Sequence, residues 1–133
     1  MNYIKAIISN IKNVDNLNIV EFKYKDQILE MMSLELSPKV VIGKEVILNI
    51  KPTHIAIAKE FQGQISISNK IKATIKELEN GKLLSSLKAK VGDTILESII
   101  TSSSSKELEL KKGDTITLLI QTSDLSISEV LDD

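Results

Sequence analysis

An internal repeat is the feature that most constrains how this chain can fold. Residues 2–6 and 69–73 share the pattern Asn-x-Ile-Lys-Ala, and the spacing between them is repeated by Ile-Leu-Glu at 28–30 and 95–97. The later blocks keep their order at a spacing three residues longer: 43–46 with 113–116, 50–53 with 120–123, and 55–57 with 125–127. The extra residues fit within the serine run Ser102 to Ser105. We therefore predict two copies of one folding unit.

The two copies define the expected domains. We place the first at residues 1–60 and the second at 64–133. The joint from Lys59 to Gln64 is short and holds neither Pro nor Ser, so we expect the copies to pack together. A unit of about 65 residues buries only about 60% of its unfolded surface. Self-association should cover the remaining apolar faces, and we favour a trimer over a dimer.

Alternating apolar side chains indicate strands in both copies. Residues 46–50 and 116–120 place Ile, Leu and Val at every second position, and turn signals such as Asn80-Gly81 and Gly92-Asp93 separate such runs. Alternation also predicts a strand from Gln64 to Asn69. About five short strands per copy are typical of a small barrel. Ser104 to Glu107 fits the capping box of a short helix, whereas Pro38 interrupts the equivalent segment of the first copy.

Composition excludes most catalytic and metal chemistry. The chain has no Cys, a single His (His54) and five Gly that do not cluster, so we expect no enzyme and no directly bound metal cation. We interpret His54 as a strand or rim histidine. All 17 basic residues are Lys, the net charge is −1, and aromatics are 3% of residues, which argues against nucleic acid. We find no targeting segment and no apolar run long enough to span a membrane, and we expect a cytoplasmic protein.

Hydroxyl side chains are unusually dense. Ser66 and Ser68 alternate along the expected strand, and residues 101–105 form an uninterrupted Thr/Ser run before the expected helix. Thr53 and the pair Thr122–Ser123 follow matching strands. Hydroxyls and backbone N–H groups can hold a tetrahedral oxyanion without proton transfer. A polar loop is the alternative interpretation of such a run.

Several blocks together resemble the Mop domain, the molybdate-binding module of the TOBE class. Residues 66–73 resemble its opening motif S-A-R-N-Q-L-x-G, and residues 97–113 resemble T-A-x-I-T-x-x-S-x-x-x-L-x-L-x-x-G. The closing motif L-I-K-A-T-x-V is matched by residues 119–125, and the first copy offers a good version of it at 50–57. The similarity covers nearly the whole chain.

This resemblance implies an all-β fold of two tandem, small OB-like barrels, each with one short helical turn. It implies a two-unit molbindin that binds and stores molybdate or tungstate at interfaces between Mop units, with no further cofactor. Carrying the motifs over residue by residue implies these oxyanion-binding residues: Lys51, Pro52, Thr53, Ser66, Ser68, Asn69, Lys70, Thr101, Ser102, Gln121, Thr122 and Ser123.

Two departures from the family pattern leave alternatives open. The Arg of the opening motif is Ser68 here and Met1 in the first copy, and the Lys of the closing motif is kept as Lys51 but replaced by Gln121. Loss of a cation should weaken a dianion site. An interaction or sensor module with degenerate oxyanion sites is therefore one alternative. An OB-type binder of single-stranded nucleic acid is the other.

Overall fold

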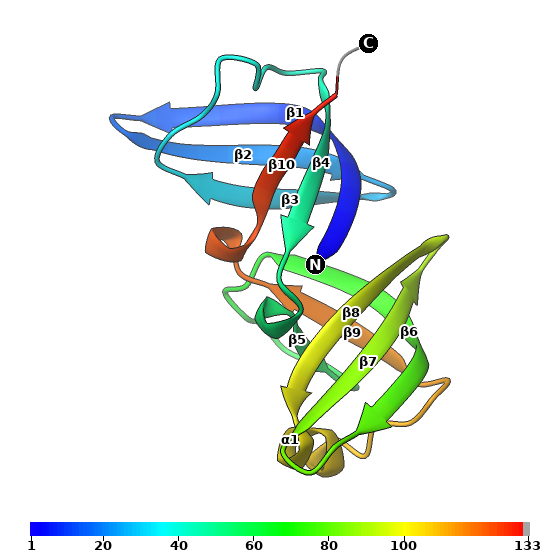
Figure 1. Ribbon diagram of the computed structural model, residues 1–133. Helices are drawn as coiled ribbons and strands as arrows, with labels where there is room; N and C mark the ends of the chain where they lie inside the picture. Colours follow the sequence, from blue (N-terminus) through cyan, green and yellow to red (C-terminus); the bar gives the residue numbers. More distant parts are fainter. Residues whose placement is uncertain (132–133) are drawn as a thin grey trace.

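A computed structural model describes residues 1–131, which form two curled, antiparallel five-stranded sheets joined by a narrow waist (Figure 1). The first sheet has the order β10-β4-β1-β2-β3. Its strands are β1 (Asn2–Val14), β2 (Leu17–Tyr24), β3 (Gln27–Ser33), β4 (Glu45–Ile50) and β10 (Ser126–Val130). This arrangement, repeated in the second sheet, confirms the all-β class with two small OB-like barrels.

The second sheet has the equivalent order β5-β9-β6-β7-β8. Its strands are β5 (Ala56–Ala58), β6 (Asn69–Asn80), β7 (Leu84–Val91), β8 (Thr94–Thr101) and β9 (Thr115–Ile120). The helical elements are α1 (Ser102–Glu107) and two 3-10 turns, η1 (Pro52–His54) and η2 (Thr122–Asp124). No helix in the described part of the chain is long and apolar enough to cross a membrane.

The two repeats exchange their last strands. β5 belongs to the first repeat but pairs with β9, and β10 belongs to the second repeat but pairs with β4 (Figure 1). The registers are equivalent, because Ala56 faces Leu119 and Ser126 faces Asn49. The ranges 1–60 and 64–133 stay a prediction for the domain boundaries, since each sheet is completed by a strand from the other range.

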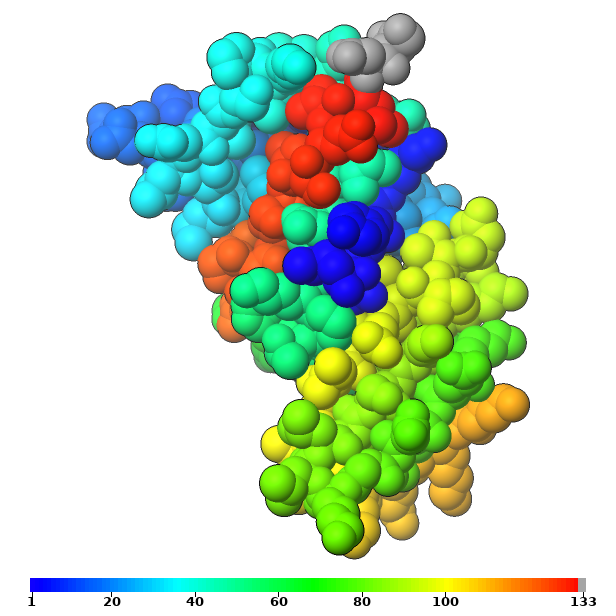
Figure 2. Space-filling view, viewed as in Figure 1, coloured from blue at the N-terminus to red at the C-terminus, as the bar shows by residue number. Residues whose placement is uncertain are grey.

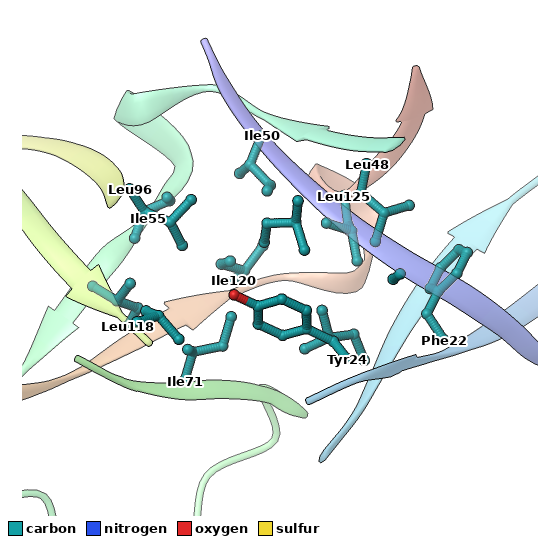
Figure 3. Packing of buried hydrophobic residues seen from close by; sticks show 14 of the residues in the cluster. Phe22, Tyr24, Leu48, Ile50, Ile55, Ile71, Leu96, Leu118, Ile120 and Leu125 are labelled. Atoms are coloured by element: carbon teal, nitrogen blue, oxygen red, sulfur yellow. The ribbon is translucent and has the colours of Figure 1, made fainter. Parts of the chain in front are cut away.

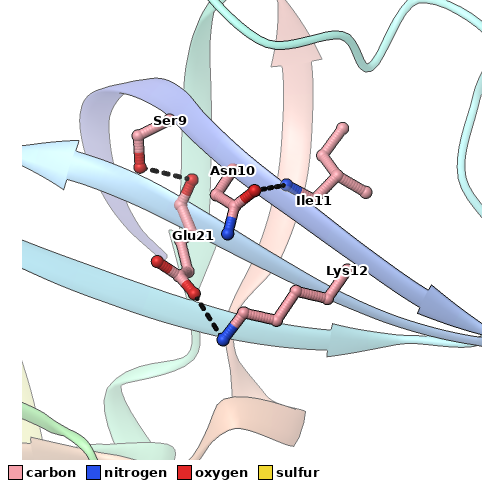
Figure 4. Close-up of polar contacts among 5 residues, drawn as sticks. All are labelled: Ser9, Asn10, Ile11, Lys12 and Glu21. Atoms are coloured by element: carbon pink, nitrogen blue, oxygen red, sulfur yellow. Dashed lines mark hydrogen bonds and ion pairs between the residues drawn. The ribbon is translucent and has the colours of Figure 1, made fainter.

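Both long first strands contain the same β-bulge. The register shifts between Ile8 and Asn10 in β1 and between Ile75 and Glu77 in β6. Asn10 Oδ1 accepts a hydrogen bond from the next backbone N–H at 3.0 Å, while Lys12 pairs with Glu21 at 2.9 Å (Figure 4). A bulge bends and twists a strand, so it lets each of these long strands follow the curvature of its sheet.

A continuous apolar core runs through both barrels and the waist. The expected alternation is confirmed, since Val46, Leu48 and Ile50 are all at most 1% exposed. Ile50, Ile55 and Ile120 meet between the two sheets, where the Tyr24 hydroxyl also ends (Figure 3). Burial of such side chains favours folding by about 1.5–3 kcal/mol each, so the waist is a packed junction.

Two asparagines close the edges of the opposite sheets. Asn2 Nδ2 donates to the Glu97 carbonyl at 2.7 Å, and its Oδ1 accepts from the Glu97 N–H at 2.8 Å. Asn69 makes the same pair of bonds with Glu30, at 2.9 and 2.7 Å. The Asn69 amide thus satisfies the backbone groups of one residue on the edge of β3, and the Asn2 amide does the same on the edge of β8.

The strand predicted from Gln64 to Asn69 is wrong in its extent. β6 begins only at Asn69, which pairs with Ile120. After Ile120, the segment that follows β9 leaves the sheet through η2. No strand therefore lies beside residues 64–68 to form hydrogen bonds with them. Ile65, Ser66 and Ser68 are accordingly exposed.

The predicted helix exists, but its cap differs. α1 begins at Ser102, and its N-cap is Thr101, whose Oγ1 accepts from the Ser104 N–H at 3.2 Å. Thr101 has the extended backbone expected at an N-cap, because it is also the last residue of β8. The equivalent segment of the first repeat, 33–38, contains no helix.

Acid should weaken the attachment of the segment after β5. Lys59 Nζ lies 3.2 Å from Asp114, and the Lys111 backbone N–H donates to the same carboxylate at 2.9 Å. The Lys111 N–H, with Lys59 second, lowers the pKa of Asp114 below its usual value. A carboxyl group with a lowered folded-state pKa stabilises the fold above its unfolded-state pKa of about 3.9 and loses this contribution as the pH falls through the folded-state value.

Replacing Asp114 by Asn should therefore reduce the loss of stability between pH 5 and pH 2. Urea unfolding midpoints measured across this range test the prediction. Asp15→Asn is the control, because Asp15 is an exposed hairpin residue with a positive φ that Asn also tolerates. Equal pH slopes for wild type and Asp114→Asn would contradict the prediction.

Candidate functional site

The two closing motifs, residues 50–57 and 119–125, are called the closing blocks below, and they meet at the waist. Each leaves its sheet in the same way: Lys51 follows β4 and Gln121 follows β9, both with extended backbone, and each is followed by a 3-10 turn. Pro52 opens η1, where its fixed φ suits the first helical position. η1 packs against β8 and η2 against β3, so each turn docks on the opposite barrel.

A contact between a histidine and an aspartate joins the two turns. His54 Nδ1 lies 3.5 Å from Asp124 Oδ1, and the side chains are 43% and 28% exposed. His54 and Asp124 are equivalent residues of the two repeats, so the pair lies where the repeats face each other. Of the two interpretations of His54, strand or rim histidine, the strand is wrong, since the residue ends η1 and contacts Asp124 of η2.

The first pocket opens on one side of this pair. It has a volume of about 190 Å³ and is lined by Met1, Asn49, Lys51, His54, Ser123, Asp124 and Ser126. Figure 2 shows the chain start, the segment after β4 and the start of β10 together at the waist. Two predicted site residues, Lys51 and Ser123, thus come from different repeats into one pocket.

The second pocket is the repeat-equivalent of the first. It has a volume of about 500 Å³ and shares His54 and Asp124 with the first pocket. Thr53, Thr101 and Gln121, three more predicted residues, line it. Several apolar side chains complete it: Ile55, Ile67, Leu84, Ile99, Ile100 and Leu119.

The two pockets differ in charge and in donors. The first offers the Lys51 ammonium, the Asn49 amide and the hydroxyls of Ser123 and Ser126. The second has Gln121 in place of the lysine. Both hold the Asp124 carboxylate, which repels anions and is paired with His54. Because a charged donor binds an anion about twice as strongly as a neutral one, the first pocket is better suited to an oxyanion.

The opening-block residues lie apart from the closing blocks. Ser66, Ser68 and Lys70 are exposed and line neither pocket, although Ile67 between them lines the second. Pro52 and Thr122 are half-buried at the start of their turns. A ligand role for these five residues stays a prediction.

Asn69 and Ser102 have structural contacts of their own. Asn69 is fully buried with both amide groups bonded to Glu30. Ser102 Oγ donates to the Gly81 carbonyl at 2.8 Å and lies 3.0 Å from Ser85 Oγ. These bonds hold α1 and the sheet edge in place, so the anion role predicted for both residues would require a contact in addition to the structural one.

A third groove lies outside this pair of pockets. A groove of about 610 Å³ runs between β10 and the segment after β3, and Ser123 is the predicted residue that it contains. Its charged side chains are Lys39, Glu35 and Glu129. Two carboxylates against one ammonium disfavour a dianion there.

Sequence reasoning missed Asn49, Ser126 and Asp124. A signal was available in the aligned repeats, where Asn49 stands opposite Leu119 and Ser126 opposite Ala56. A polar residue at a position that is apolar in the sister repeat marks a place where the repeats diverge. Within residues 1–131, no three His, Asp or Glu side chains gather as a metal site would require.

The sequence was compared with protein families and curated proteins. Residues 65–127 match the family model of the TOBE domain. This range covers most of the second repeat, including Ser66 at its start and η2 at its end. No significant match to a curated protein was found.

A solved structure has the same fold along nearly the whole chain. It is the cytoplasmic molybdate-binding protein ModG with molybdate bound, and it superposes with a TM-score of 0.89 over 95% of this chain and 94% of that chain. The sequences are 23% identical. At this identity the likeness shows the fold alone.

Proposed function

We propose that this chain binds molybdate. The proposal rests mainly on the composition of the first pocket. There Lys51 and Ser123, assigned to oxyanion binding from the sequence alone, come together from opposite repeats. The TOBE match and the shared fold with a molybdate-binding protein support the same ligand. No side chain in this pocket needs to transfer a proton, so the proposed role is binding without catalysis.

The proposal extends to the cellular role. We infer that both repeats are Mop-like domains, since residues 65–127 match the TOBE model and the first repeat has equivalent strand registers. Storage and homeostasis of molybdate or tungstate in the cytoplasm fit a small binding protein, and the ModG structure is described as cytoplasmic. Self-association, with a trimer favoured, would bring Ser66, Ser68 and Lys70 of one chain toward the closing blocks of another.

Titration calorimetry tests the ligand. Molybdate and tungstate should bind, and sulfate should bind at least tenfold more weakly, because a cage of fixed donors fitted to the larger anions makes poorer contacts with a smaller one. Binding should depend weakly on salt compared with a nucleic-acid groove. Equal affinity for sulfate and molybdate would leave a general anion site, and absence of binding would reject the proposal.

A second candidate is an interaction module whose oxyanion sites are degenerate. The second pocket favours it, since the lysine of the closing motif is Gln121 there and the lining is largely apolar. Native mass spectrometry recorded alongside the titration separates the two functions. An assembly that forms but binds no anion would support the interaction module.

A further inference from the structure

The side chains that line the two related pockets differ at two positions that are not among the predicted oxyanion-binding residues. Asn49 in β4 and Ser126 in β10 face each other across the exchanged strand pair, and both line the first pocket. The repeat-equivalent pair in the second barrel is Leu119 and Ala56, which also face each other and line the second pocket. The same backbone arrangement therefore presents polar groups in one pocket and hydrocarbon in the other.

A hydrogen bond fixes the orientation of the Asn49 amide. Ser126 Oγ donates to Asn49 Oδ1, which directs this oxygen toward β10. Within residues 1–131, the Nδ2 group of Asn49 makes no hydrogen bond of its own. An amide whose oxygen is already engaged offers two N–H donors to the pocket, and such donors suit an oxyanion.

We infer that Asn49, oriented by Ser126, determines which of the two pockets takes the oxyanion. Asn49 contributes the binding donor beside Lys51, and Ser126 is a positioning residue that acts through Asn49. The second pocket keeps the hydroxyls of Thr53, Thr101 and Ser104, but it lacks the Asn–Ser pair and the lysine, so it has no ammonium donor to hold a tetrahedral dianion. This inference rests on the proposed molybdate binding and adds that each chain has one competent pocket of this pair.

Exchanging the residues between the pockets tests the inference. Asn49→Leu combined with Ser126→Ala installs the residues that the second barrel already carries at these positions, so the sheet should be maintained. We expect molybdate affinity to fall about tenfold or more, with the thermal unfolding temperature close to that of wild type. The reverse transfer, Leu119→Asn with Ala56→Ser and Gln121→Lys, should add one bound molybdate per chain.

Asn49→Asp provides a control for packing. The side chains have nearly the same shape, but the carboxylate replaces the N–H donors with negative charge, so binding should fall further than in Asn49→Leu with Ser126→Ala. If the anion bound away from Asn49, Asn49→Asp would keep nearly the wild-type affinity at equal stability. Wild-type affinity in either variant overturns this inference alone, whereas failure of the wild type to bind molybdate rejects the proposed function itself.

Discussion

Asn69→Ala should lower the free energy of unfolding by about 2–5 kcal/mol, because it leaves two backbone groups of Glu30 without their hydrogen-bond partner. The amide of Asn69 satisfies both the N–H and the carbonyl of Glu30 on the outer edge of β3. An unsatisfied buried donor or acceptor costs about 1–3 kcal/mol. Alanine also leaves the edge of β3 uncovered. The free energy of unfolding is measured from urea denaturation at constant m-value.

The repeat supplies a matched partner for this experiment. Asn2→Ala should cost a similar amount, since Asn2 makes the same two bonds with Glu97. Asn18→Ala is the control, because Asn18 is almost as buried but its side-chain oxygen accepts a single bond from Asn13. We expect the control to lose about 1 kcal/mol or less. A stable Asn69→Ala variant that no longer binds molybdate would instead support the ligand role predicted from the motif.

The repeat made most of the fold predictable. Alternation of buried side chains at residues 46–50 and 116–120 gave the strands, because a strand with one face in a core shows its period directly. The exchange of β5 and β10 was not predictable. The last strand of each repeat could pair, in the same register, with the fourth strand of its own repeat or with that of the other repeat. The local sequence does not distinguish these two arrangements.

The sequence located part of the pocket lining. Residues of the closing blocks stand out because they recur in both repeats at a strand end, and Lys51 and Ser123 share a pocket. Their role in anion binding stays a prediction. In the hydroxyl run at 101–105, Thr101 caps α1 and Ser105 bonds to Asn80 at 2.8 Å, so these hydroxyls have structural contacts whether or not they also bind an anion. Hydroxyl density does not distinguish a ligand donor from a structural one. That distinction depends on which partners lie nearby in space.

Lys51→Ala should weaken molybdate binding about tenfold to a hundredfold. Lys51 is the one lysine in the first pocket, where the Asp124 carboxylate opposes an anion. A charge-assisted hydrogen bond contributes about 1.5–3 kcal/mol, and each 1.4 kcal/mol is a factor of ten in affinity. The titration is compared with Lys23→Ala, which removes the same charge from an exposed residue of β2 that lines neither pocket and is not among the predicted site residues.

Gln121→Lys examines the same position in the sister repeat. The added ammonium should give the second pocket weak molybdate binding. The full transfer, which also installs Asn at position 119 and Ser at position 56, should bind more tightly because it adds neutral donors for the remaining oxyanion oxygens. Ser66→Ala should cost less than Lys51→Ala, since it removes a neutral donor, and Thr53→Ala should leave binding at the first pocket unchanged, since Thr53 lines the second. If Lys51→Ala kept both the affinity and the stoichiometry of wild type, Lys51 would be a solvated residue at the end of a strand, and the molybdate site would lie away from the first pocket.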